Sequence, residues 1–302
     1  MGEMKALNVG PSGIEVAYER FGDPQAPPVL LVQGLAAQMI NWHEDFCAEL
    51  VARGMQVIRF DNRDVGRSSH FPDAPPPDLP AVLAGDLSSA SYNLSDMAAD
   101  AVGLLDALGL DSAHIVGLSM GGAIAQTIAI ERPGRIRSLT SMLSTTGDMS
   151  VGQATPETLS ALFAGPPAEG RQQVIDQRVR AARVVGSPGF EFDEAAARDR
   201  AGLGYDRGYD PAAIARTAVA SVASGDRTAL LRGLDVPALV IHGADDPMCD
   251  VSGARATAAA IPGAELVIID GLGHDLPRAL WSEITSRIAT LVQRVESVTV
   301  ND

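Results

Sequence analysis

The stretch Gly117-Leu118-Ser119-Met120-Gly121 constrains the fold of this chain more than any other, because it joins two different kinds of element. The apolar residues 114–116 just before it indicate a buried strand. The residues after it indicate a helix that ends before Pro133. A strand that turns directly into a helix brings backbone segments close together, so the positions beside the turn must lack a Cβ atom. The sequence therefore predicts a tight turn that exposes the Ser119 hydroxyl, which is typical of a nucleophilic serine.

The composition favours a folded protein with a large core and argues against several classes of partner. The chain has 302 residues, 46% of them hydrophobic, and a net charge of −15. Like charges repel, so this charge argues against nucleic acids and anionic membranes as partners. Cys47 and Cys249 give neither a disulfide framework nor a metal-ligand spacing, and residues 1–5 do not resemble a signal peptide. We therefore expect a cytoplasmic protein without a metal or an organic cofactor, and we leave open whether it forms a homo-oligomer.

Short apolar runs typical of strands alternate with helical patterns along most of the chain. Such alternation predicts an α/β fold, in which a mostly parallel sheet is flanked by helices on both faces. Residues 71–91 carry five prolines and are expected to form an irregular loop. The predicted strands are 14–21, 28–32, 56–60, 114–116, 136–143, 237–242 and 265–269.

The alternation of strands and helices is interrupted over residues 147–234. Thr155-Pro156 and Asp210-Pro211 within this segment look like helix starts, because a capping residue precedes a proline in each. We therefore predict a helical cap over 147–234, inserted between the two parts of one core at 1–146 and 235–302.

The residues that could carry chemistry follow the predicted strands. Parallel sheets of this kind bind their ligands at the carboxyl ends of the strands. The loops after Val32, Phe60, Gly117, His242 and Ile269 should all lie at that edge. This agreement is stronger evidence for a site than any single motif.

A serine hydroxyl becomes a good nucleophile only when a neighbouring base takes its proton. Of the five histidines, His274 is the best candidate, since it follows the last predicted strand in a glycine-rich loop. His242 ends a strand nearby and is expected to pack against the site or support it. His43 and His114 are expected to be structural. His70 borders the proline-rich loop, where it either faces water or lines the pocket.

The base in turn needs a carboxylate that holds its tautomer and stabilises the imidazolium. The loop after the strand 237–242 offers Asp245, Asp246 and Asp250. Asp246 is favoured because Pro247 restricts the residue before it to extended geometry. Asp245 has no such restraint and is expected to bond the local backbone or to face water.

Acyl transfer also needs N–H donors for the negative charge that develops on the carbonyl oxygen. The N–H of Met120 is one candidate, because it follows the serine in the turn. The loop after Val32 should supply the second, and Leu35 is the best candidate there. These two residues form the predicted oxyanion hole.

At this point the sequence resembles the α/β-hydrolase superfamily, over residues 14–146 and 236–292. In relatives the position of Gln33 usually holds His, and that of Asp64 usually holds Gly. Asp64 with Gly66-Arg67-Ser68 resembles the branch that contains aclacinomycin methylesterase, which removes a methyl ester from a polyketide antibiotic. The resemblance implies a triad of Ser119, Asp246 and His274 and an oxyanion hole of Leu35 and Met120. The matching motifs are Gln33-Gly34, Asp61-Asn62-Arg63-Asp64-Val65-Gly66-Arg67-Ser68, Gly117-Leu118-Ser119-Met120-Gly121-Gly122, Gly243-Ala244-Asp245-Asp246-Pro247 and Gly273-His274.

These features predict a serine carboxylesterase that hydrolyses esters of small or medium apolar substrates through an acyl-enzyme. Lactonases, carbon–carbon bond hydrolases and perhydrolases share the same triad and stay open as alternatives, as does a hydrolase-like receptor for small molecules. We expect Met39, Trp42 and apolar residues of 159–163 to line the substrate pocket.

Overall fold

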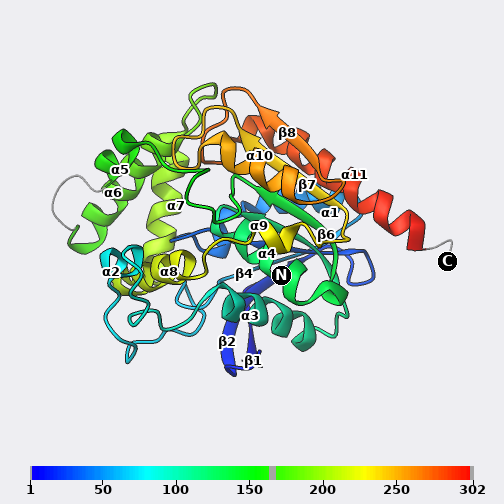
Figure 1. The fold of residues 1–302 in the computed structure, drawn as a ribbon, viewed down its shortest axis with the longest axis horizontal. Coiled ribbons are helices and arrows are strands. Elements are labelled where there is room, and N and C mark those ends of the chain that lie inside the picture. The colour runs from blue at the N-terminus through cyan, green and yellow to red at the C-terminus, as the bar shows by residue number, and fades with distance from the viewer. Residues whose placement is uncertain (1, 163–167, 300–302) are drawn as a thin grey trace.

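A computed structural model describes residues 2–162 and 168–299 of the chain (Figure 1). Over these residues, eight strands form one sheet in the order β1-β2-β4-β3-β5-β6-β7-β8. The strands from β4 to β8 in this order run parallel, whereas β2 pairs antiparallel with both β1 and β4. The prediction of a mostly parallel sheet is confirmed. In chain order the strands are β1 (Met4–Val9), β2 (Ile14–Phe21), β3 (Pro28–Val32), β4 (Gln56–Phe60), β5 (Ala113–Leu118), β6 (Ile136–Met142), β7 (Ala238–Gly243) and β8 (Glu265–Ile269).

Helices cover both faces of the sheet. Successive side chains of a strand point to opposite faces, so each central strand contributes to two cores. Leu30 and Val32 of β3 belong to a core that includes α3, α4 and α10. Val29 and Leu31 belong to a second core on the other face, with α1 and α11. These helices are α1 (Glu44–Ala52), α3 (Leu94–Ala107), α4 (Met120–Glu131), α10 (Val251–Ala260) and α11 (Trp281–Thr299), with 3-10 turns η1 (Met39–Asn41), η2 (Pro133–Arg135) and η3 (Arg278–Leu280).

The strand order places the two loops of the predicted site side by side. The chain passes from β3 to β4 on one side and later returns to place β5 on the other side of β3. Val32, the last residue of β3, is in register with Gly117 near the end of β5. The loop that carries Leu35 therefore begins beside the turn that carries Ser119.

The segment between β6 and β7 is helical, as the sequence predicted. Pro156 and Pro211 begin helices, and Asp210 caps the second by accepting hydrogen bonds from the N–H groups of Ala212 and Ala213. Figure 1 shows α5 to α8 gathered at one end of the sheet. The helices of this insertion are α5 (Pro156–Leu162), α6 (Gly170–Val185), α7 (Glu194–Arg207), α8 (Pro211–Ala223) and α9 (Thr228–Leu231).

The strand β1 and the short helix in the proline-rich segment were not predicted from the sequence. In β1, Ala6 and Val9 are buried but lie three residues apart, and the pairing with β2 is irregular between them. This irregularity removes the alternation by which strands are recognised. The proline-rich segment contains α2 (Leu79–Leu83), which Asp78 caps through the N–H of Ala81.

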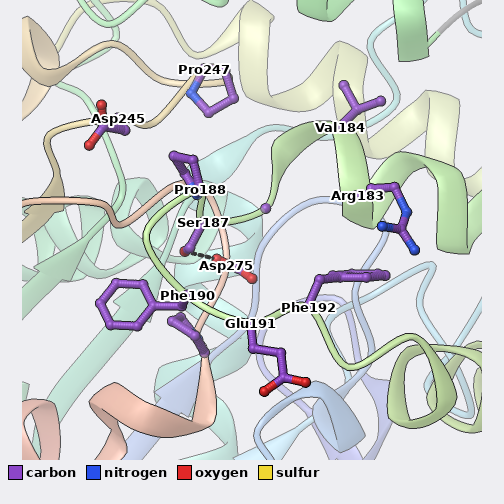
Figure 2. Close-up of a pocket in the computed structure, with 12 residues that line it drawn as sticks. Arg183, Val184, Ser187, Pro188, Phe190, Glu191, Phe192, Asp245, Pro247 and Asp275 are labelled. Atoms are coloured by element: carbon purple, nitrogen blue, oxygen red, sulfur yellow. Dashed lines mark hydrogen bonds between the residues drawn. The ribbon is translucent and has the colours of Figure 1, made fainter.

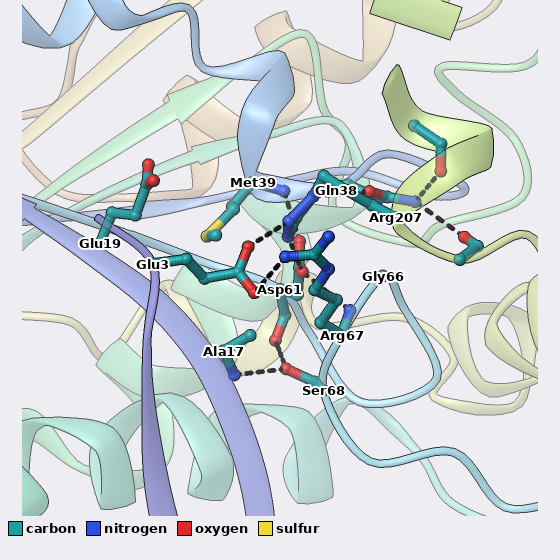
Figure 3. Close-up of polar contacts among 12 residues, drawn as sticks. Glu3, Ala17, Glu19, Gln38, Met39, Asp61, Gly66, Arg67, Ser68 and Arg207 are labelled. Atoms are coloured by element: carbon teal, nitrogen blue, oxygen red, sulfur yellow. Dashed lines mark hydrogen bonds and ion pairs between the residues drawn. The ribbon is translucent and has the colours of Figure 1, made fainter. Parts of the chain in front are cut away.

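Buried ion pairs fasten the insertion to the core. Arg207 of α7 bonds to Asp61, which follows β4 and also accepts a 2.7 Å hydrogen bond from the Met39 N–H (Figure 3). Arg216 of α8 donates two 2.8 Å hydrogen bonds to Asp64. Asp64, the unusual residue of the sequence motif, therefore serves here to hold the insertion in place.

Replacing Arg216 by methionine should lower the free energy of unfolding by about 3 kcal/mol, because the buried Asp64 carboxylate loses its charged partner. Urea unfolding followed by circular dichroism measures this loss. Arg171→Met is the matched control, since its ion pair with Asp206 on the same insertion is about half exposed and should contribute little. Equal losses in the two variants would contradict the proposed role of the Asp64 pair.

The same pair makes stability depend on pH. Burial opposes the charge on Asp64, but hydrogen bonds from Arg216 and Tyr92 outweigh it and lower the pKa of the carboxyl group. A carboxyl pKa that is lower in the folded state stabilises the protein above its unfolded value, about 3.9, and the effect is lost as the pH falls. The Arg216→Met variant should therefore differ most from the parent protein near neutral pH and least in acid.

Candidate active site

Ser119 lies in the turn between β5 and α4, in a strained backbone conformation. Its φ of 56° and ψ of −122° are unusual for a residue with a side chain and cost on the order of 1–3 kcal/mol. The flanking glycines make the turn sterically feasible. A Cβ atom on Gly117 would lie 2.0 Å from the Gly121 oxygen, and one on Gly121 would lie 2.1 Å from the Val32 oxygen. The turn therefore requires glycine at both positions.

The structure brings together the serine, the histidine and the aspartate named from the sequence. The Nε2 atom of His274 lies 2.9 Å from the Ser119 Oγ. The Nδ1 atom of the same ring lies 2.7 Å from the Asp246 Oδ2. A potential base is thus within hydrogen-bond reach of a serine hydroxyl, and a carboxylate orients that base, which is the arrangement needed to activate a serine.

The second oxygen of Asp246 is fixed by the backbone. Its Oδ1 accepts hydrogen bonds of 2.9 Å and 2.8 Å from the N–H groups of Met248 and Cys249. The two other candidate carboxylates have different roles. Asp245 accepts a hydrogen bond from the Gly271 N–H, and Asp250 caps α10.

His242 lies next to Asp246. Its Nε2 atom is 3.6 Å from the Asp246 Oδ2 and donates a 2.7 Å hydrogen bond to the Cys249 carbonyl oxygen. Burial lowers the pKa of His242, so the neutral ring is favoured beside the carboxylate. Its remaining nitrogen, Nδ1, is buried without a hydrogen-bond partner in the described chain.

The three other histidines make contacts outside this constellation. His43 caps α1 by accepting a hydrogen bond from the Asp45 N–H. His114 is buried between Ser138 and Glu296. His70 bonds to the Gly66 carbonyl oxygen at the base of the proline-rich loop.

The predicted oxyanion-hole residues lie near Ser119. Leu35 and Met120 line the same cavity as Ser119 and His274. The loop of Leu35 is anchored by Asn62, whose side chain donates a 3.1 Å hydrogen bond to the Gln33 carbonyl oxygen. This anchoring keeps the loop next to the serine turn.

The cavity at the serine has a volume of about 200 Å³ and a mixed lining. Besides Ser119, hydroxyl groups come from Ser144 and Thr145 after β6 and from Ser221 of the insertion, which also contributes the Arg227 side chain. The described residues that line it are Leu35, Ser119, Met120, Ala123, Leu143, Ser144, Thr145, Gly147, Gly152, Ser221, Arg227, Met248, Cys249 and His274.

Met39 and Trp42, expected in the pocket, do not line this cavity. Both are buried in the core, and the Trp42 ring packs against Phe46 with 5.4 Å between ring centroids. Trp42 precedes α1, at the end of the 3-10 turn η1, and it packs with Phe46 and Leu50 of α1 in the core. Leu159 is 40% exposed and does not line the cavity, and Phe163 lies outside the described residues.

The insertion also contacts the loop that carries His274, which the sequence did not reveal. The His274 N–H donates a 2.7 Å hydrogen bond to the Val185 carbonyl oxygen. The Ser187 hydroxyl accepts a 2.9 Å hydrogen bond from the Gly273 N–H and donates to the Asp275 carboxylate. Figure 2 shows Ser187 and Asp275 in the wall of a second cavity, of about 320 Å³, beside these loops.

Ser187→Ala should lower kcat about 10- to 100-fold with a smaller change in KM, because a small misplacement of the His274 ring weakens proton transfer. Steady-state kinetics with one ester measures both constants. Ser187→Thr keeps the hydroxyl and should restore most of kcat. A loss in Ser187→Ala that appears only in KM, or an equal loss in both variants, would contradict a positioning role.

The chain belongs to the alpha/beta hydrolase fold family, whose model matches residues 27–277. Rhodomycin D methylesterase from Streptomyces peucetius is 30% identical over 290 residues, which cover 89% of this chain and 92% of the relative. The chain thus resembles a methylesterase across almost its whole length. Family and relative together support ester hydrolysis.

Solved structures show the same fold. An esterase from Rhodococcus sp. ECU1013 superposes with a TM-score of 0.72 at 22% identity, covering 96% of this chain and 100% of that one. The enol-lactonase from Burkholderia xenovorans LB400 gives 0.67 at 24% identity, covering 97% and 100%. At these identities the likeness concerns the fold.

Two further observations concern membranes and metals. Among the described residues, no helix is both long and apolar enough to span a lipid bilayer. The same residues contain no group of three or more His, Cys, Asp or Glu side chains arranged to hold a metal ion. The expectation that no cofactor takes part remains a prediction.

Proposed function

We propose that this protein is a serine carboxylesterase that works through an acyl-enzyme. The observation that carries the proposal is the continuous chain of hydrogen bonds from the Ser119 Oγ through the His274 ring to Asp246. The methylesterase relative supports the same reaction class.

In the proposed reaction, the Nε2 atom of His274 takes the proton of Ser119 while the Oγ attacks the ester carbonyl carbon. Asp246 stabilises the imidazolium that forms. The N–H groups of Leu35 and Met120 would stabilise the oxyanion. The imidazolium then protonates the leaving alcohol. A water molecule attacks the acyl carbon while the same ring takes its proton, and the ring returns that proton to the Ser119 Oγ as the acid is released.

We further propose that residues 147–234 act as a cap over the core formed by 1–146 and 235–302. The contribution of Ser221 and Arg227 to the cavity wall supports this division. A cap that shapes the pocket should control which esters are accepted more than the reactivity of the serine.

A panel of p-nitrophenyl esters, methyl esters, lactones and vinylogous diketones tests the proposal. We expect rapid multiple turnover of esters, together with a covalent fluorophosphonate adduct on the peptide that contains Ser119. Turnover confined to lactones or diketones would instead identify one of the other reactions of this triad. Tight retention of a small molecule without turnover would identify a receptor.

A further inference from the structure

Five arginines of the described chain are less than a tenth exposed, and four of them are paired with carboxylates. Burying an unpaired charge is costly, so such pairing is the general rule. Arg227 is 6% exposed and forms no ion pair within the described residues. The four other arginines with a similarly small exposed fraction pair as Arg59–Glu19, Arg63–Asp100, Arg207–Asp61 and Arg216–Asp64.

Arg227 is held only by neutral acceptors. Its Nε–H donates to the Gln126 side-chain oxygen at 3.2 Å, and its terminal nitrogens donate to the carbonyl oxygens of Gly225 and Thr145, each at 3.1 Å. A guanidinium has five N–H groups, so two have no partner in the described chain. Burial lowers the pKa of Arg227 to about 10, and the group therefore remains charged at neutral pH.

The nearest acid in the sequence does not neutralise this charge at close range. Asp226 is exposed and accepts hydrogen bonds from the N–H and hydroxyl of Thr228. Its attraction acts on Arg227 only through space, without an ion-pair contact. The guanidinium thus lacks a counter-ion where it is buried.

Arg227, the residue that carries this charge, lies in the wall of the catalytic cavity. Arg227, Ser119 and His274 line the same cavity, and no Asp or Glu is among its described lining residues. Gln126, which holds the guanidinium, lies seven residues beyond Ser119, about 10 Å along the axis of α4. Ala123, one turn into the same helix, lines the cavity between these two positions.

We propose that Arg227 forms an anion-binding subsite of the catalytic cavity, and that the preferred substrates are esters bearing a second, ionised carboxyl group. Monoesters of linear dicarboxylic acids are the simplest members of this class. A carboxylate matches the planar donor pattern of a guanidinium and supplies the missing counter-charge. The inference rests on the proposed esterase function and replaces the expected apolar substrate by an anionic one.

The test compares kcat/KM for monomethyl esters of succinate to suberate with that for neutral methyl esters of the same chain length. The parent protein should prefer the anionic ester by about 10- to 100-fold at the best length, which is typical of hydrogen bonds to a charged group. Arg227→Met should reduce this ratio to near one, and Arg227→Lys should keep part of it. Arg232→Met removes the same charge from the exposed end of α9 and should leave the ratio unchanged.

The outcomes separate the subsite from the esterase reaction. A ratio near or below one at every length, with neutral esters still hydrolysed, overturns the subsite and leaves the esterase proposal intact. The subsite is equally overturned if Arg227→Met folds and keeps the preference for the anionic ester. If Arg227→Met does not fold, the ratios of the parent protein and of Arg227→Lys are compared instead, and an unchanged ratio in Arg227→Lys overturns the subsite.

A binding measurement covers the case in which no ester is turned over. Adipate should then raise the melting temperature of the parent protein more than neutral adipamide does. Equal effects of the two compounds would overturn the subsite without reference to catalysis.

Discussion

Ser119→Ala is expected to lower kcat for ester hydrolysis by about 10⁶-fold, because removal of the nucleophile of a triad leaves only the contribution of the remaining binding groups. The expectation rests on the position of the Ser119 hydroxyl relative to the His274 ring. The Ser119 hydroxyl lies 2.9 Å from the His274 Nε2, and its residue forms the turn between β5 and α4. Steady-state kinetics with a reactive p-nitrophenyl ester measures the loss.

Ser144→Ala is the matched control for this experiment, since Ser144 lines the same cavity but lies outside the strained turn. It should still form the covalent fluorophosphonate adduct, whereas Ser119→Ala should not. Full labelling of Ser119→Ala would show that another group is the nucleophile and would remove the basis for the proposed mechanism.

The sequence predicts the part of the site that depends on strand ends. Ser119 and Asp246 follow the buried apolar strands β5 and β7, and His274 follows β8, a partly buried apolar strand at the edge of the sheet. Apolar strands of this kind are recognisable from short local patterns. Once the strands are parallel neighbours, their carboxyl ends must meet at one edge. Local patterns and the rule for parallel sheets therefore suffice to bring these three residues together.

The parts contributed by the insertion could not be predicted in the same way. Ser187 meets Gly273 across 86 positions of sequence, and Arg227 meets Gln126 across 101. Such contacts depend on how helices pack and leave no local periodicity. An arginine in a helical segment also looks the same in sequence whether it is solvated, paired or left without a counter-ion.

The error at Trp42 has a related cause. An amphipathic pattern shows that a face is buried, but it does not show whether the face packs on the sheet or lines a pocket. Trp42 is fully buried with Phe46, so the pattern correctly indicated burial and the assignment to the pocket was the added step. At Asp64 the motif indicated a branch of the family but not the role of the residue. In the structure this carboxylate binds Arg216 of the insertion.

Under the proposed mechanism, Asp246→Asn should lower kcat by about 10⁴-fold, because it favours the wrong tautomer of the His274 ring. The Oδ1 of Asp246 accepts hydrogen bonds from two backbone N–H groups, those of Met248 and Cys249. An asparagine would keep its oxygen there and turn its NH₂ group toward the Nδ1 of His274. The ring would then carry its proton on Nε2 and could no longer accept the proton of Ser119.

Asp245→Asn is the matched comparison, one residue away in the same loop. Asp245 accepts a 2.8 Å hydrogen bond from the Gly271 N–H, and an asparagine oxygen can accept the same bond. The loss should be no greater than that of one ordinary hydrogen bond, about 1 kcal/mol, or roughly fivefold in kcat/KM. Asp246 bonds to the His274 ring, whereas Asp245 bonds to the Gly271 N–H. If Asp245→Asn lost more activity than Asp246→Asn, the hydrogen bond between Asp246 and His274 would not be the one that orients the base.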